Sequence, residues 1–248
     1  MKKATLGLIT TGQGPRNEYV RYHRNVMWEL GVDVDIKICN SMDELTREEI
    51  RTLESLPRER EIGHHIHEEG ATGDKLGKGW KRILTDSQPL IPLFQQCLES
   101  LEAQGVDATI LCCVEEFPTE VFESRNPFFL PWLLVTEWVR ITTMCMTEPR
   151  IGLLILDEEH RAQDLATWSS QPWMERLDMV VEIAGGRLDA ALTRCRQEQV
   201  DLVVYWGYGL GLGPSDPPDK LQSVYQTLGP IPLIAPNRVV AYHARNQL

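Results

Sequence analysis

Apolar and polar positions follow a strand–helix order that repeats along the chain. Short apolar runs are typical of strands buried in a parallel sheet. They occur at 4–10, 32–38, 107–113, 150–156, 179–183, 201–206 and 231–235. Between them, apolar residues recur at helical spacing, which predicts helices at 15–31, 46–56, 87–104, 131–145, 188–199, 219–228 and from 237 onward. One more helix is predicted between the loop 157–160 and the strand 179–183.

Local signals sharpen several of these elements. Thr46 and Glu49 have the spacing of a capping box, and Pro15 suits a first helical position. Ser87 is expected to cap the helix that follows it. The segment 32–38 alternates apolar and acidic residues, which predicts a strand near a sheet edge. Residues 60–81 are predicted to form a polar hairpin with a glycine-rich tip at 70–79.

Strands that alternate with helices predict an α/β fold with parallel sheets. The second half repeats the order of the first, so we expect two pseudo-symmetric Rossmann-like lobes, each with a central parallel sheet. The expected first lobe comprises 1–118 and 231–248, and the expected second lobe comprises 119–230.

Composition limits the classes of partner that the chain is expected to bind. The 248 residues carry a net charge of −11, which argues against nucleic acid or an acidic membrane surface as a partner. No apolar run reaches membrane-spanning length, and the N-terminus has no signal-peptide pattern. We therefore expect a cytoplasmic protein with its six cysteines reduced, and a homodimer stays open.

Two strand ends carry the candidate chemistry. In an open α/β sheet, ligands bind at the carboxyl ends of the strands. One predicted strand ends in Cys112 and Cys113, and its counterpart in the second half ends at Gly207. Cys113 is therefore the candidate reactive thiol, which a nearby arginine or a helix N-terminus would make a thiolate. We expect Cys112 to be a core residue.

Removing a proton from the carbon next to a carboxylate needs a base, an anion clamp and donors for the developing charge. Arg16 could bind the carboxylate through its forked guanidinium. The backbone of Gln13, of Gly14 and of the turn from Gly207 could stabilise the negative charge, and His160 could replace a second thiol as acid or base. The predicted catalytic residues are Cys113 and His160, and the predicted substrate-binding residues are Gln13, Gly14, Arg16, Val114, Glu115, Gly207 and Tyr208.

Three segments resemble the AroM family, a branch of the aspartate/glutamate racemase superfamily. They are residues 8–18 (LITTGQGPRNE), residues 45–50 (LTREEI), and residues 95–107 with the strand end at 111–118 (LCCVEEFP). The resemblance implies a pseudo-symmetric α/β fold in which two strand-end cysteines face a carboxylate substrate. One thiolate removes a proton and the other thiol returns one, with no metal or organic cofactor.

The chain departs from this pattern. Val114 and Glu115 replace a threonine and a glycine, and Gly207 replaces the second cysteine. We therefore expect a cofactor-independent isomerase or racemase-like enzyme that uses Cys113. One thiol also suits a lyase of decarboxylase type, in which a single protonation follows loss of carbon dioxide. A non-catalytic carboxylate-binding protein is the third reading.

Two further motifs carry less weight. His65 and His67 share a strand face, as in a metal site, but no third ligand has a clear spacing, so no metal is predicted. The glycine-rich tip lacks the phosphate-loop pattern. Trp206, beside the missing cysteine, is expected to narrow the pocket in favour of a flat or small substrate.

Overall fold

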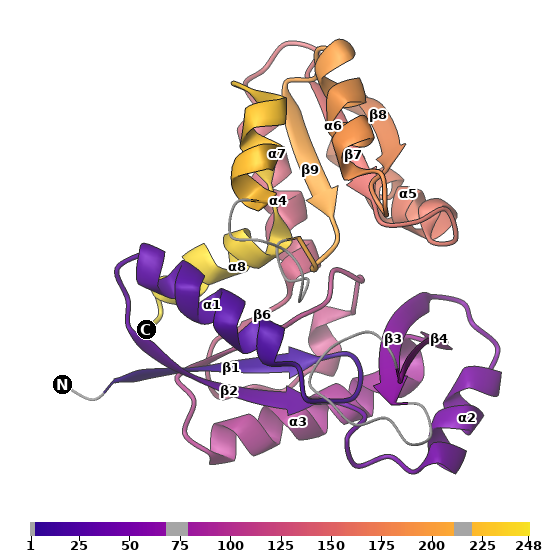
Figure 1. The fold of residues 1–248 in the computed structure, drawn as a ribbon, viewed down its shortest axis with the longest axis vertical. Coiled ribbons are helices and arrows are strands. Elements are labelled where there is room, and N and C mark those ends of the chain that lie inside the picture. Colours follow the sequence, from indigo (N-terminus) through magenta and orange to yellow (C-terminus); the bar gives the residue numbers. More distant parts are fainter. Residues whose placement is uncertain (1–2, 68–78, 211–219) are drawn as a thin grey trace. The chain divides into compact units, whose positions relative to one another are not determined.

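The structure is a computed structural model that describes residues 3–67, 79–210 and 220–248. The glycine-rich tip predicted at 70–79 and most of the loop after Gly207 lie outside the described residues. The chain divides into two compact units: unit 1 is Met1–Pro131 with Val240–Leu248, and unit 2 is Trp132–Val239. Each has its own parallel sheet, as the sequence predicts (Figure 1).

Unit 1 is built on a four-stranded sheet of order β2-β1-β5-β6, with a separate β3–β4 hairpin. Its elements are β1 (Ala4–Thr10), α1 (Asn17–Glu29), β2 (Val34–Asn40), α2 (Arg47–Ser55), β3 (Glu61–His67), β4 (Trp80–Asp86), a 3-10 turn (Gln88–Leu90), α3 (Ile91–Ala103), β5 (Ala108–Leu111), a 3-10 turn (Thr119–Val121) and β6 (Phe128–Phe129). Leu6, Leu8 and Ile9 of β1 are completely buried.

Unit 2 is built on a four-stranded sheet of order β10-β9-β7-β8. Its elements are α4 (Pro131–Thr143), β7 (Arg150–Ile155), α5 (Arg161–Ser169), a 3-10 turn (Pro172–Arg176), β8 (Asp178–Ile183), α6 (Leu188–Gln197), β9 (Leu202–Trp206), α7 (Lys220–Leu228) and β10 (Leu233–Ile234). The last helix, α8 (Pro236–Arg245), begins in unit 2 and ends in unit 1.

The two sheets have the same topology and share one pair of matching hydrogen bonds. In each, the first strand lies between the second and the third, and the fourth lies beyond the third. The Asp107 carboxylate accepts from the Thr5 backbone N–H at 2.8 Å, and the Asp107 N–H donates back to the Thr5 carbonyl. Asp201 makes the same pair of bonds with the backbone of Arg150. The predicted pseudo-symmetry therefore holds at the amino ends of β5 and β9.

Most predicted elements are confirmed, with small shifts at their ends. The capping box of Thr46 and Glu49 is present, β2 is an edge strand, and the predicted hairpin is β3–β4. Two helix starts differ from the prediction. Helix α1 begins at Asn17 rather than at Pro15, and a 3-10 turn that the Ser87 side chain does not cap precedes α3.

The expectation that all cysteines are reduced is wrong for one pair. Cys39 of β2 and Cys97 of α3 form a disulfide, with their Cα atoms 5.6 Å apart. Because 58 residues separate them in sequence, only the packing of α3 against β2 brings them together. The other cysteines, including Cys112 and Cys113, are not in disulfides.

Among the described residues, every helix is too short or too polar to cross a lipid bilayer.

Candidate functional site

Cys113 lies in the turn that directly follows β5. Its N–H donates to the Leu111 carbonyl at 2.8 Å, which turns the chain away from the strand direction. Its Sγ accepts from the Glu115 N–H at 3.5 Å. The side chain is only 8% exposed, and burial, followed by the charge of Glu115, raises the pKa of the Cys113 thiol far above its usual value. The expected thiolate does not fit this environment, because the thiol stays protonated at neutral pH.

The residues next to Cys113 in sequence differ in their burial and in their partners. Cys112 is one of the buried core residues, as predicted. Val114 and Glu115 are buried beside the thiol. The carboxylate of Glu116 pairs with Arg60 at 2.7 Å. Of the two neighbouring acids, Glu115 is therefore the one whose charge acts on Cys113.

Arg16 is the N-cap residue of α1 and is almost completely buried. Its Nε donates to the Glu18 carboxylate at 2.5 Å, and its guanidinium lies 4.6 Å from the centre of the Tyr19 ring. The negative groups around it raise its pKa although burial opposes this, so it stays charged. Cys112 lies close enough to Arg16 to influence its pKa, which places the guanidinium near the end of β5.

The loop before Arg16 is held by the hairpin and by β2. The Gln13 N–H donates to the His65 carbonyl at 3.0 Å, and the Gln13 side chain accepts from the His67 N–H at 2.9 Å. The Gly14 N–H donates to the Asp43 carboxylate at 2.7 Å. Both backbone donors already have acceptors within the protein. The predicted use of these two amides for the developing charge of a substrate therefore does not fit the structure.

Two of the three histidines of β3, His64 and His67, use their rings in contacts within unit 1. His64 is completely buried, with one ring nitrogen on the Thr11 carbonyl and the other 2.7 Å from the Thr85 hydroxyl. His67 uses Nε2 on the Gly14 carbonyl and stacks on Trp80, with ring centres 4.1 Å apart. This strand therefore clamps the loop that precedes Arg16.

In unit 2, Gly207 takes the place that Cys113 has in unit 1. Its N–H donates to the Tyr205 carbonyl at 3.1 Å, matching the bond from Cys113 to Leu111. Cys113 follows Asp107 by six residues, and Gly207 follows Asp201 by six. A Cβ at Gly207 would lie 2.8 Å from Cγ of Leu156, so this side chain fills the space of an equivalent cysteine.

The surroundings of Gly207 are held by buried polar bonds. The Trp206 indole donates to the Asp164 carboxylate at 3.1 Å, and its ring packs on that of Trp168. The Asn237 amide donates to the carbonyls of Tyr208 and Leu210 at 3.3 and 2.8 Å. Trp206 is thus fixed against α5 by its own indole.

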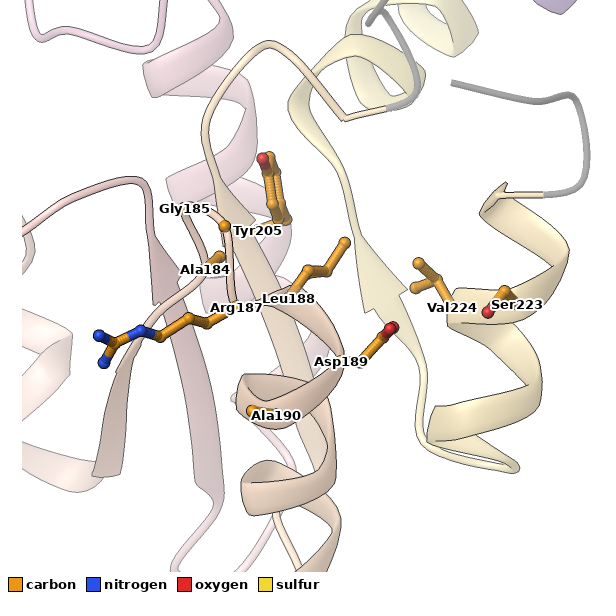
Figure 2. Close-up of a pocket in the computed structure, with 10 residues that line it drawn as sticks. Ala184, Gly185, Arg187, Leu188, Asp189, Ala190, Tyr205, Ser223 and Val224 are labelled. Atoms are coloured by element: carbon orange, nitrogen blue, oxygen red, sulfur yellow. The ribbon is translucent and has the colours of Figure 1, made fainter. Parts of the chain in front are cut away.

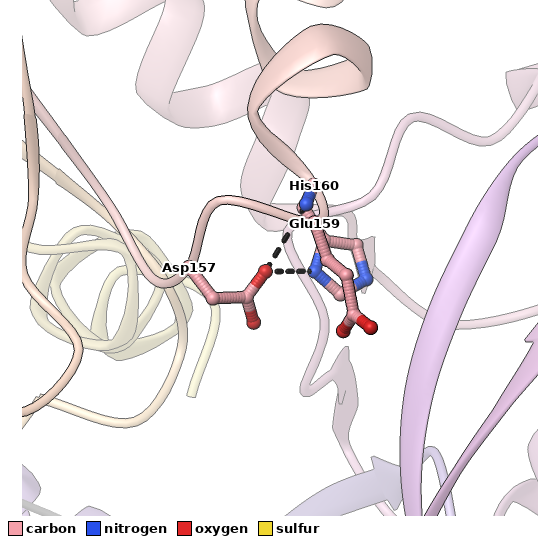
Figure 3. A group of neighbouring side chains, drawn as sticks. All are labelled: Asp157, Glu159 and His160. Atoms are coloured by element: carbon pink, nitrogen blue, oxygen red, sulfur yellow. Dashed lines mark hydrogen bonds and ion pairs between the residues drawn. The ribbon is translucent and has the colours of Figure 1, made fainter.

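His160 is the N-cap residue of α5, the position that Arg16 has at α1. Figure 3 shows the Asp157 carboxylate accepting from both the ring Nδ1 and the backbone N–H of His160, at 2.7 and 3.1 Å. Because a carboxylate can only accept, Nδ1 carries the proton and Nε2 carries the lone pair of the neutral ring. Asp157, Glu159 and His160 also have ligand atoms within 4.8 Å of one another, so these three could hold a metal ion.

A cavity in unit 2 was not predicted from the sequence. It has a volume of about 630 Å³ and lies at the start of α6, where the loop 184–187 follows β8 (Figure 2). Tyr205, Leu188 and Val224 supply its apolar wall, and Asp189 and Ser223 supply polar groups. The adjacent glycines Gly185 and Gly186 could have indicated this cavity from the sequence, because a glycine pair between a strand and a helix marks a turn.

The predicted site residues fall into two groups. Unit 1 holds Gln13, Gly14, Arg16, Cys113, Val114 and Glu115, and unit 2 holds His160, Gly207 and Tyr208. Within unit 1, Arg16, Cys112 and Cys113 all lie close enough to Tyr19 to influence its pKa, so the anion clamp and the thiol belong to one neighbourhood.

Known structures share this fold. The aspartate racemase of Picrophilus torridus is 10% identical, with a TM-score of 0.53 over 98% of this chain and 94% of that chain. PH1733, an aspartate racemase homologue from Pyrococcus horikoshii, is 12% identical, with a TM-score of 0.52 over 99% of this chain and all of that one. At these identities the likeness establishes the fold alone. No curated protein matches the sequence. The model of the AroM protein family matches residues 6–210, and the chain therefore belongs to the AroM family.

Proposed function

We propose that this protein is a cofactor-independent enzyme that transfers a proton at the carbon next to a carboxylate, as an isomerase or racemase-like catalyst. Cys113 is the proton donor and Arg16 binds the substrate carboxylate. The observation that carries the proposal is the unequal pair of strand ends, with a protonated thiol after β5 and a glycine after β9. Membership of the AroM family and the fold shared with aspartate racemases make this class of chemistry the first one to test.

The raised pKa of Cys113 favours a role as proton donor. A buried, protonated thiol is poorly suited to remove a proton from carbon in the resting protein, but it can give one. A base takes the proton from the substrate carbon, and the electron pair moves into the carboxylate. Cys113 then protonates that carbon and becomes a thiolate. The thiolate recovers a proton from water while the base releases its own.

His160 is the residue that we propose as a general base, on the geometry of its own loop in unit 2. The Asp157 carboxylate orients the ring so that Nε2 carries the lone pair. This is the arrangement that activates a histidine for general-base catalysis.

A lyase is the second candidate, and the protonated state of Cys113 favours it specifically. In a decarboxylation, the bond between the carbon and one carboxyl group breaks and carbon dioxide leaves. The electron pair stays on the substrate, and Cys113 protonates that carbon. This route needs one acid and no base, which a single protonated thiol satisfies.

Solvent exchange separates these reactions. The purified protein is incubated in deuterium oxide with 2-substituted carboxylic acids, including aspartate, glutamate, 2-phenylpropionate and phenylmalonate. Proton NMR follows deuterium entry at the carbon, and carbon dioxide release is measured in parallel. Exchange that retains the carboxylate identifies an isomerase, and carbon dioxide release identifies a lyase.

Two variants assign the residues. We expect Cys113→Ala to lower either rate by about 10²- to 10⁴-fold, the usual contribution of a general acid, while Cys145→Ala, at an exposed cysteine of unit 2, leaves the rate unchanged. His160→Gln should slow exchange but not decarboxylation. If carboxylates bind and no acid reacts in a Cys113-dependent way, the protein is a binding protein and the catalytic proposal is wrong.

A further inference from the structure

Strand β3 lies along the loop that carries Arg16. Three histidines of this strand contact the loop: His64 at the Thr11 carbonyl, His65 through its own carbonyl to the Gln13 N–H, and His67 at the Gly14 carbonyl. The contact with His65 is so close that a Cβ at Gly12 would lie 2.6 Å from the His65 carbonyl oxygen. The position of β3 relative to Arg16 is therefore fixed.

His65 differs from its two neighbours in the use of its ring. Alternation along β3 places the rings of His64 and His65 on opposite faces, and the ring nitrogens of His64 both have partners. Within the described part of the chain, the His65 ring has no hydrogen-bond partner, although it is partly buried. Burial, and then the positive charges of Arg16 and of its cross-strand neighbour Arg82, lower the pKa of His65 to about 4. The imidazole is therefore neutral at physiological pH and close enough to Arg16 to respond to its charge.

Most hydrogen-bond donors of the Arg16 guanidinium are not used within the described residues. Glu18 occupies its Nε, and the terminal Nη nitrogens contact no acceptor among the described residues. A guanidinium offers five N–H donors in a fork, so four remain for a ligand. The Arg16–Glu18 pair carries no net charge, which leaves hydrogen-bond donors rather than excess positive charge as the main attraction for an anion.

We infer that His65 and Arg16 bind the same substrate carboxylate, one oxygen on the guanidinium and the other on the imidazole N–H. The inference rests on the proposed function, because it takes the ligand to be a carboxylate, and it adds a residue and a second hydrogen bond to that site. A neutral imidazole donates without adding a second positive charge beside Arg16. The β3–β4 hairpin is thereby part of the binding site, and His65 is a substrate-binding residue.

Binding is tested without turnover in a Cys113→Ser background. Isothermal titration calorimetry measures the Kd for phenylmalonate, malonate and 2-phenylpropionate. Removing the donor with His65→Leu should raise the Kd about tenfold, in the range expected for a hydrogen bond to a charged group. His65→Gln keeps an N–H donor and should stay within about threefold of the parent. The matched control His243→Leu, on α8, should leave the Kd unchanged.

Thermal unfolding of each variant verifies that it is folded. The inference is overturned if an acid binds and His65→Leu leaves its Kd unchanged, or if His65→Gln loses as much affinity as His65→Leu. It is also overturned if none of the acids binds. Failure of the catalytic proposal looks different: the acids bind in a His65-dependent way, yet the protein with Cys113 intact neither exchanges nor decarboxylates them.

Discussion

The sheets of unit 1 and unit 2 share one strand order. Each also has an aspartate hook, the pair of hydrogen bonds that Asp107 makes with Thr5 and that Asp201 makes with Arg150. The carboxyl ends of their strands, however, hold different residues. Unit 1 ends in a buried thiol near an arginine, and a histidine-rich strand clamps the loop beside it. In unit 2, β9 is followed by Gly207, which packs against Leu156, and the Trp206 indole is hydrogen-bonded to α5. A repeated backbone therefore does not require repeated chemistry, and each end is specified by its own side chains.

The largest expected difference between the units comes from the disulfide of unit 1. Cross-linking Cys39 to Cys97 closes a loop of 58 residues, for which chain entropy predicts a stabilisation of about 4 kcal/mol. We expect Cys97→Ser, or reduction of the parent, to lower the free energy of unfolding by about 2–4 kcal/mol in urea. Cys195→Ser, in the core of unit 2, is the comparison without a cross-link. A parent whose urea midpoint ignores reductant would contradict this.

Acid should weaken unit 1 through buried neutral histidines. Burial lowers the pKa of His23 and of His64 to about 4, from about 6.5 in the unfolded chain. Because the folded pKa is lowered, the unfolded chain binds protons first. The stability is fully present above about pH 6.5 and is lost as the pH falls toward 4. Each histidine should contribute up to about 3 kcal/mol.

Urea unfolding at pH 7.5, 5.5 and 4.5 measures this loss. The variant His23→Gln should flatten the dependence on pH, since Gln does not titrate. An equally steep loss in His23→Gln and His64→Gln would show that other groups cause the acid sensitivity.

A smaller effect is expected where a glycine of the first strand meets the helix behind it. A Cβ at Gly152 would lie 2.6 Å from the Cys195 Sγ of α6, and one at Gly7 would lie 3.2 Å from Leu101 Cδ1 of α3. Overpacking of this kind costs about 1–3 kcal/mol. Gly152→Ala should destabilise the protein, and adding Cys195→Ala should recover most of the loss. Additive losses in the double variant would mean that the contact with Cys195 is not the cause.

The smallest structural change tests the missing thiol directly. Gly207→Cys should cost about 1–2 kcal/mol in stability, since the new Cβ would press on Leu156. Adding Leu156→Ala should relieve this, because Leu156 is partly exposed and leaves space on truncation. Urea unfolding of the single and the double variant measures both effects. An equal loss of stability in the single and the double variant would mean that the contact with Leu156 is not the cause.

Short-range signals in the sequence were enough for most of the fold. The capping box of Thr46 and the apolar runs of β1 and β9 act within a few residues, so periodicity and spacing reveal them. The site depended on contacts that no local pattern encodes. The pairing of Cys39 with Cys97, the occupied amides of Gln13 and Gly14, and the docking of His65 beside Arg16 all join residues 29 or more positions apart.

The thiol illustrates why a position is easier to predict than a charge state. That Cys113 follows a buried strand can be read from its apolar run, and its place at the strand end is confirmed. Its protonation depends on burial and on which neighbouring carboxylate acts on it. The sequence shows Glu115 and Glu116 side by side, and only the ion pair of Glu116 with Arg60 separates their effects.

The aspartate hooks have a consequence for how such a protein can change. Asp107 and Asp201 fasten each sheet at its amino edge, while every candidate chemical group lies at the opposite edge. Substitutions at the carboxyl edge of one unit therefore leave the fastening of both sheets intact. One half can lose a reactive group and gain a tryptophan or leucine while the other half keeps its own. The residues that fasten the sheets and the candidate functional residues therefore lie at different edges, so the functional residues of each half can change independently.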